Sequence, residues 1–66
     1  MNVVLNGELR EFPAPLTIAE LLAALQMPTR GVAVEVNREI VPRHLHEQQR
    51  LHEGDRLEIV SLVGGG

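Results

Sequence analysis

The residues best placed to do chemistry are the last three, Gly64, Gly65 and Gly66. Glycine loses more backbone freedom than any other residue when it is ordered, so this run cannot help a fold. It can instead form a thin, flexible tail that threads through a channel too narrow for a Cβ atom. The tail therefore predicts that the reactive group is the terminal carboxylate of Gly66, presented to the active site of another protein. The alternative is a frayed chain end without a function.

The rest of the chain offers few other reactive groups. With 66 residues it has room for one small core and none for an enclosed active site, so we do not expect an enzyme. The absence of cysteine excludes disulfides, thiolate zinc sites and thiol nucleophiles. The net charge is −3 and the six basic residues, all arginine, are scattered, which argues against nucleic-acid binding. No membrane span or signal peptide is indicated, so the expected location is the cytoplasm.

Three histidines, His44, His46 and His52, could be interpreted as a metal cluster. They lie in polar segments predicted to be loops and have no cysteine beside them, so we expect solvated or loop-packing side chains and no metal site. Arg43, which follows Pro42, could contact a partner protein, but a solvated or capping arginine is at least as consistent with the sequence.

A hairpin is predicted at the N-terminus. Residues 2–5 alternate as a strand, and Asn6-Gly7 is typical of a two-residue turn, because both central positions of such a turn need positive φ. The return strand is predicted over residues 8–12 and ends at the prolines that follow, with Phe12 as its core contact. The apolar face of the first strand consists of Met1, Val3 and Leu5.

A helix is predicted from Ile18 to about Gln26. Thr17 and Glu20 have the spacing of a capping box at its start, and Leu16 and Leu21 stand at the positions of a hydrophobic staple. One face of the helix carries an apolar stripe at the helical period, made of Ile18, Leu21, Leu22 and Leu25. Such a stripe must pack on a sheet.

The remaining elements follow without a linker. An alternating, β-branched run predicts a strand over residues 32–36, followed by a turn at 37–39 and a short segment at 40–41. Residues 43–50 have the polarity of a surface loop with at most one helical turn, and Leu51 is expected to anchor this loop to the core. After a turn at 53–55, the last strand is predicted over residues 56–63.

This order of elements predicts the fold. The first and last strands can be parallel neighbours only if the intervening helix crosses over one face of the sheet. The result is an α+β fold, a β-grasp (ubiquitin-like) roll with a mixed sheet crossed by one main helix. We therefore expect a single domain over residues 1–63 and a flexible glycine tail over residues 64–66.

The chain resembles, over its whole length, the sulfur carrier proteins of thiamine thiazole biosynthesis, the ThiS family. The order, spacing and collinearity of the matching segments carry the resemblance. These segments are Asn6-Gly7-Glu8, residues 16–22, residues 34–37, residues 40–43, residues 54–60 and residues 63–66. The chain departs from the family at His46, where members often have an aromatic residue.

The resemblance implies a mechanism. A partner ThiF-like adenylating enzyme uses MgATP to convert the Gly66 carboxylate into an acyl-adenylate. A persulfide supplied by a sulfur-donor protein displaces AMP and leaves a thiocarboxylate, whose sulfur passes to a ThiG-like thiazole synthase. The carrier itself would bind no cofactor and supply no catalytic residue. The sulfur donor, and whether one carrier serves several pathways, do not follow from the resemblance, and nor does the oligomeric state.

A partner-docking patch is predicted beside the tail. If Leu57 and Ile59 point inward, alternation along the last strand places Glu58, Val60 and Leu62 on the face that the helix does not cover. Val60 and Leu62 would then be apolar and exposed next to the reactive end, which favours a docking role over scattered surface residues. The alternative is that isolated exposed apolar residues are ordinary.

Three alternatives to the thiazole pathway stay open. The same tail chemistry could serve another acceptor, such as molybdopterin synthase, whose small subunit shares the fold and a terminal Gly-Gly. A ubiquitin-like modifier would instead be joined to protein amines through Gly66. A plain β-grasp binding module would lose nothing if the glycines were removed.

Overall fold

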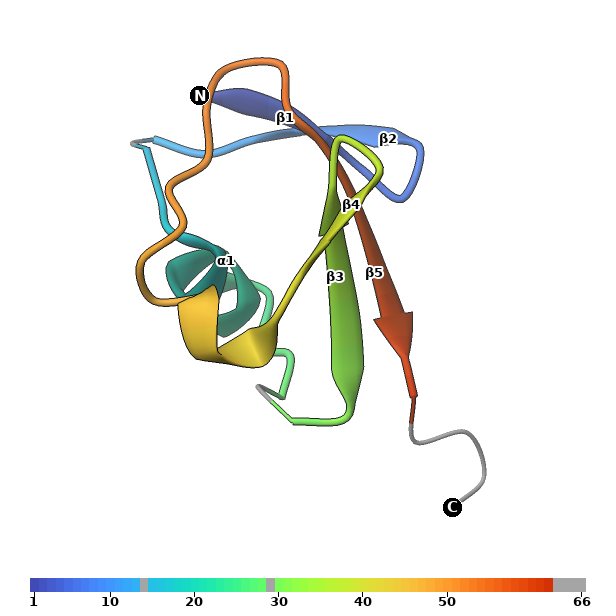
Figure 1. Cartoon of the computed structure of the whole chain (residues 1–66). Coiled ribbons are helices and arrows are strands. Elements are labelled where there is room, and N and C mark those ends of the chain that lie inside the picture. Colours follow the sequence, from blue (N-terminus) through green and yellow to red (C-terminus); the bar gives the residue numbers. More distant parts are fainter. Residues whose placement is uncertain (14, 29, 63–66) are drawn as a thin grey trace.

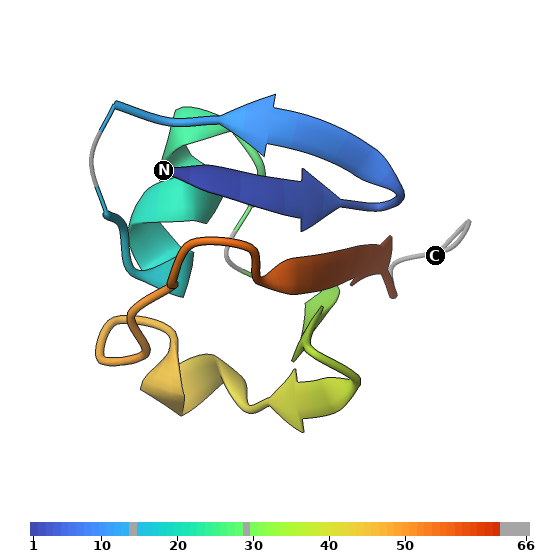
Figure 2. The same ribbon diagram turned by 90° about the horizontal axis from the view of Figure 1, so that it is seen from above.

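A five-stranded sheet forms one layer of the molecule (Figure 1). The computed structural model describes residues 1–13, 15–28 and 30–62. The strands are β1 (Asn2–Leu5), β2 (Glu8–Glu11), β3 (Val32–Val36), β4 (Glu39–Val41) and β5 (Arg56–Ser61), in the order β2-β1-β5-β3-β4. The central pair, β1 and β5, is parallel, whereas the other neighbouring strands are antiparallel. In Figure 2 the β1–β2 hairpin lies on one side of β5.

The helix α1 (Ile18–Ala24) lies on one side of this sheet (Figure 1). Its predicted capping box is present, because the Thr17 hydroxyl accepts from the Glu20 N–H at 3.2 Å and the Glu20 carboxylate accepts from the Thr17 N–H at 2.8 Å. The helix buries its predicted stripe against the inner face of the sheet, with Leu25 only partly buried. The fully buried core side chains are Val3, Ile18, Leu21, Leu22, Val34, Leu51 and Leu57.

The parallel pairing of the first and last strands confirms the β-grasp prediction. Val4 lies opposite Arg56 and Leu5 opposite Leu57, so the two ends of the chain share the middle of the sheet. Two parallel neighbours need a crossover connection, and here the chain between them includes α1 on the inner face. The core predicted from the first hairpin is also present, since Val3 and Leu5 are buried and the partly buried Met1 and Phe12 pack against the core cluster.

The segment that follows β4 lies against the start of α1, where its Gln49 and His46 carbonyls accept from the Ile18 and Ala19 N–H groups. It begins with a single 3₁₀ turn, η1 (Arg43–Leu45), which is the one helical turn that the polar pattern allowed. The segment returns to the core at Leu51, which is 2% exposed and donates its N–H to the Leu16 carbonyl at 2.8 Å. Leu51 therefore anchors the loop as predicted.

Four predicted boundaries need correction. The helix ends at Ala24 rather than near Gln26, because Gln26 adopts a left-handed φ of 58° and Met27 turns back to bond the Leu22 carbonyl. The return strand ends at Glu11, one residue early, and Glu39 belongs to β4 because the turn before it needs only two residues. The last strand ends at Ser61, and Val63 lies outside the described residues.

Candidate functional site

The described part of the site is the end of β5 that leads to the glycines. Gly64, Gly65 and Gly66, predicted to thread and carry the reactive carboxylate, lie outside the described residues. Their predicted roles therefore stay predictions, as does the division into a domain and a tail. What the structure does describe is the chain up to Leu62 and the contacts that hold it.

Side chains alternate between the two faces of the sheet along β5. Leu57 and Ile59 point into the core and are 1% and 6% exposed, whereas Val60 and Leu62 are 51% and 67% exposed. The alternation predicted from the sequence is thus confirmed, and the helix covers neither Val60 nor Leu62. Their role in docking a partner stays a prediction.

The end of β5 is held mainly by β3. Val60 lies opposite Ala33 and Ser61 opposite Val32, and the Leu62 N–H donates to the Gly31 carbonyl at 2.6 Å. On its other side β5 pairs with β1, but that register extends only from Arg56 to Leu57.

The carboxamide of Asn6 extends the hydrogen bonding between β1 and β5 beyond Leu57, to Ile59. Its Oδ1 accepts from the Ile59 N–H at 2.8 Å and its Nδ2 donates to the Ile59 carbonyl at 3.2 Å. Sequence reasoning explained Asn6 only as a turn residue and missed this contact, because the partner lies 53 positions away. No local pattern in the sequence could have indicated it.

Two further exposed apolar residues share the outer face of the sheet, and sequence reasoning did not single them out. Leu9, which is 72% exposed, lies opposite Val4, and Ile40, which is 69% exposed, lies opposite Glu35. Residues directly opposite each other project to the same face, so the register places both with Val60. The alternation of the edge strands was the signal that could have found them.

Charged side chains occupy the middle of that outer face. Glu35 and Glu58 lie directly opposite each other, which places two like charges side by side. Together with Arg38 and Arg56 they border a shallow hollow. The outer face of the sheet is thus charged at its centre, and the exposed Val60 and Leu62 lie beyond this centre, toward the glycines.

Among the described residues, the histidines considered as metal ligands do not form a metal site. His46 is 4% exposed, and its Nε2 lies 2.9 Å from the Val41 carbonyl, so it packs the loop onto β4. His44 and Arg43 are exposed on η1, beside His46. Across residues 1–13, 15–28 and 30–62, no group of three or more His, Cys, Asp or Glu side chains is arranged to hold a metal ion.

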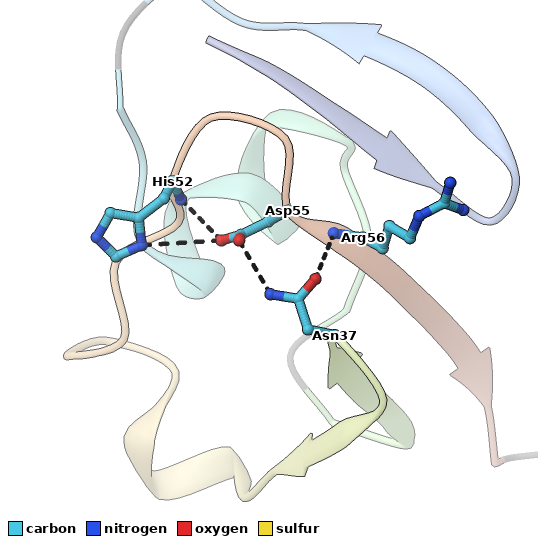
Figure 3. Close-up of polar contacts among 4 residues, drawn as sticks. All are labelled: Asn37, His52, Asp55 and Arg56. Carbon is cyan, nitrogen blue, oxygen red and sulfur yellow. Dashed lines mark hydrogen bonds and ion pairs between the residues drawn. The ribbon is translucent and has the colours of Figure 1, made fainter.

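The remaining histidine belongs to a structural network (Figure 3). The Asp55 carboxylate accepts from the His52 N–H at 2.8 Å and from the Asn37 Nδ2 at 3.0 Å, while the Asn37 Oδ1 accepts from the Arg56 N–H at 3.0 Å. The His52 ring lies farther away, with its Nδ1 3.9 Å from Asp55. Both carboxylate oxygens are already engaged by the protein, so the network fixes the turn before β5.

A sequence model of the ThiS family matches residues 3–66, which is nearly the whole chain. The chain belongs to the ThiS family. The matched residues include the hairpin, the helix and the glycine run. No helix in the part of the chain that the structure describes is long and apolar enough to cross a membrane.

Individual relatives agree with this membership. The chain is 30% identical to the sulfur carrier protein ThiS of Escherichia coli (strain K12) over 66 residues, which cover 100% of both chains. It is 48% identical over 66 residues to a thiazole synthase of Paramagnetospirillum magneticum, of which it spans only 20%. The crystal structure of the thiamine biosynthesis protein ThiS from Geobacter metallireducens superposes with a TM-score of 0.86 at 32% identity, over 100% of both chains.

Proposed function

We propose that this protein is the sulfur carrier of thiamine thiazole biosynthesis and that Gly66 carries the sulfur as a C-terminal thiocarboxylate. The observation that carries the proposal is the end-to-end match to a protein named sulfur carrier protein ThiS, in which this chain and that protein are both covered completely. The proposal requires that Gly66 is the last residue of the functional chain.

The chemistry begins with activation of the carboxylate, because a carboxylate oxygen is a poor leaving group. A ThiF-like partner enzyme would bind MgATP and direct the Gly66 carboxylate at the α-phosphorus, which releases pyrophosphate and forms the acyl-adenylate. The carrier contributes the backbone of the tail to this step. Glycines at positions 64 and 65 suit a narrow channel, since they place no Cβ atom beside its walls.

Sulfur then replaces the activated oxygen. The terminal sulfur of a donor persulfide attacks the acyl carbon and AMP leaves, which produces an acyl disulfide. A thiol cleaves its S–S bond, forms a new disulfide with the donor sulfur and releases the thiocarboxylate. Because the carrier has no cysteine, it cannot capture this sulfur in a disulfide of its own.

A ThiG-like thiazole synthase is the proposed acceptor. The support is that a protein named thiazole synthase includes, within one fifth of its length, a segment 48% identical to this chain over 66 residues. A carrier-like segment within a thiazole synthase favours the view that this carrier passes its sulfur to such a synthase. It does not favour molybdopterin synthase.

The exposed apolar residues at the end of β5 are the proposed docking site for these partners. Val60 and Leu62 are about half to two-thirds exposed and directly precede the tail, so a partner that covers them is also positioned to receive the carboxylate. Burial of apolar side chains in an interface contributes a favourable free energy of about 25 cal/mol per Å² of buried apolar area.

The experiment that tests the proposal is intact-mass measurement of the protein purified from its own cells. The expected result is a species heavier by the exchange of one oxygen for one sulfur, with the change located at Gly66 by fragmentation. Incubation with MgATP and the adenylating enzyme should also give a species heavier by one AMP. A protein that shows neither species, or that continues beyond Gly66 in the cell, would contradict the proposal.

A further inference from the structure

Asn6 has a side chain that its turn does not need. It begins the two-residue turn between β1 and β2 with a φ of 49°, and Gly7 follows with a φ of 83°. Asparagine, aspartate and glycine all suit the first position of such a turn. Of these three, only asparagine carries both a donor and an acceptor, and the structure uses both of them on one residue of β5.

The contact reproduces a strand pairing. A strand neighbour would satisfy the N–H and the carbonyl of the facing residue, and the Asn6 carboxamide satisfies these same two groups of Ile59. The backbone of β1 bonds β5 as far as Asn6, whose N–H donates to the Leu57 carbonyl at 2.9 Å, and the chain then turns at Gly7. The side chain thus replaces the next strand residue and extends the β1–β5 ladder toward the tail.

We propose that Asn6 is a positioning residue that fixes the tail-proximal end of β5 for docking, an inference that rests on the proposed function. Among the described residues, Ile59 is the last position of β5 that has a hydrogen-bond partner on the β1 side. Within residues 1–13, 15–28 and 30–62, the backbone of Val60 to Leu62 pairs only on the β3 side. Without the Asn6 carboxamide, the part of β5 that is bonded on the β3 side alone would begin two residues earlier, after Leu57.

The consequence is a matter of preorganisation. A docking segment that is ordered before binding does not have to lose that conformational freedom when the partner arrives. If Asn6 holds β5 in place, its loss should weaken binding of the carrier while leaving the chemistry of the tail unchanged. The effect should therefore appear in KM and not in kcat.

The chain contains a matched control in Asn37. It also begins a two-residue turn, with a φ of 52°, and its Oδ1 also accepts from a backbone N–H of β5, that of Arg56, at 3.0 Å. This contact lies at the opposite end of β5 from the tail, as Figure 3 shows for Asn37 and Arg56. A general loss of stability should affect both variants, whereas loss of tail positioning should affect only Asn6.

The experiment compares Asn6→Gly with Asn37→Gly in the full chain. Glycine keeps the positive φ of each turn without strain and removes the carboxamide. Hydrogen exchange should quicken at the Ile59 amide in Asn6→Gly and at the Arg56 amide in Asn37→Gly. Adenylation by the partner enzyme with MgATP should show a KM for the carrier raised about five- to tenfold in Asn6→Gly, with kcat retained, the size expected for loss of one to two hydrogen bonds.

A second variant guards against a folding defect. Asn6→Asp keeps the turn and the acceptor for the Ile59 N–H but places an oxygen against the Ile59 carbonyl, so it should raise KM in the same direction. Equal KM values for Asn6→Gly and the wild type, or the same rise in Asn37→Gly, would overturn the inference alone. A wild-type chain that the enzyme does not adenylate would overturn the proposed function and the inference with it.

Discussion

At the residue scale, Leu22 tests how the core holds the molecule together. Its side chain is 0% exposed, beneath the sheet, so Leu22→Ala should lower the free energy of unfolding by about 2–5 kcal/mol through lost burial and a residual cavity. That is a large share of the stability of so small a domain. Chemical denaturation followed by circular dichroism measures the change.

The matched control is Leu9→Ala, because Leu9 is the same residue type but 72% exposed on β2. Its loss should change the free energy of unfolding by less than about 0.5 kcal/mol. Equal effects of the two substitutions would mean that the helix stripe does not form the core as described.

Some roles of single residues could be predicted from the sequence and others could not. Buried leucines such as Leu22 follow from periodicity, because a helix that crosses a sheet must turn its apolar stripe inward. The carboxamide of Asn6 does not follow, since its partner Ile59 is 53 positions away and becomes adjacent only when β1 and β5 pair. Nor could the polar loop pattern tell a buried His46 from an exposed His44.

At the element scale, the existence of each helix and strand could be predicted, and the errors lie at their ends. Capping and alternation mark where an element begins, so Thr17 fixed the start of α1 correctly. The end of α1 has no such signal, because the residue that adopts left-handed φ there is Gln26 instead of a glycine. Arg38 likewise has positive φ in the β3–β4 turn, where the sequence gives no sign of it.

The exposed apolar residues of β5 allow a test of partner docking. Val60→Glu combined with Leu62→Glu should leave the fold intact, because both side chains are exposed. The two charges would have to be desolvated against an apolar partner surface. Adenylation should therefore show a raised KM for the carrier with kcat largely retained, since the glycines proposed to enter the active site are unaltered.

Leu9→Glu combined with Ile40→Glu is the matched control for that double change. These residues are also apolar and exposed on the outer face, but they lie on the two edge strands β2 and β4. If only the β5 pair raises KM, docking is centred beside the tail. Unchanged kinetics in the β5 pair would show that recognition lies elsewhere, and unfolding would show that Val60 and Leu62 support the core.

At the scale of the whole molecule, the described core and the proposed reactive group occupy different parts of the chain. The β-grasp topology could be predicted because so short a chain leaves few ways to cover one helix with its strands, and the parallel β1–β5 pair bears this out. The last buried side chain among the described residues is Ile59. All buried side chains of the described residues thus precede the glycines.

Removing Gly65 and Gly66 should therefore abolish adenylation and leave the fold unchanged. The far-ultraviolet circular dichroism and the melting temperature should match those of the wild type, because residues at a chain end usually contribute little to stability. A chain with one glycine added after Gly66 is the matched control, since it keeps every native residue but moves the carboxylate by one position. It should fold normally and be adenylated poorly, because the active site of the partner must meet the carboxylate at a fixed distance from the docked β5. Full activity in the shortened chain would mean that the reactive group is not the terminal carboxylate of Gly66, and a lower melting temperature would mean that the glycines belong to the folded domain.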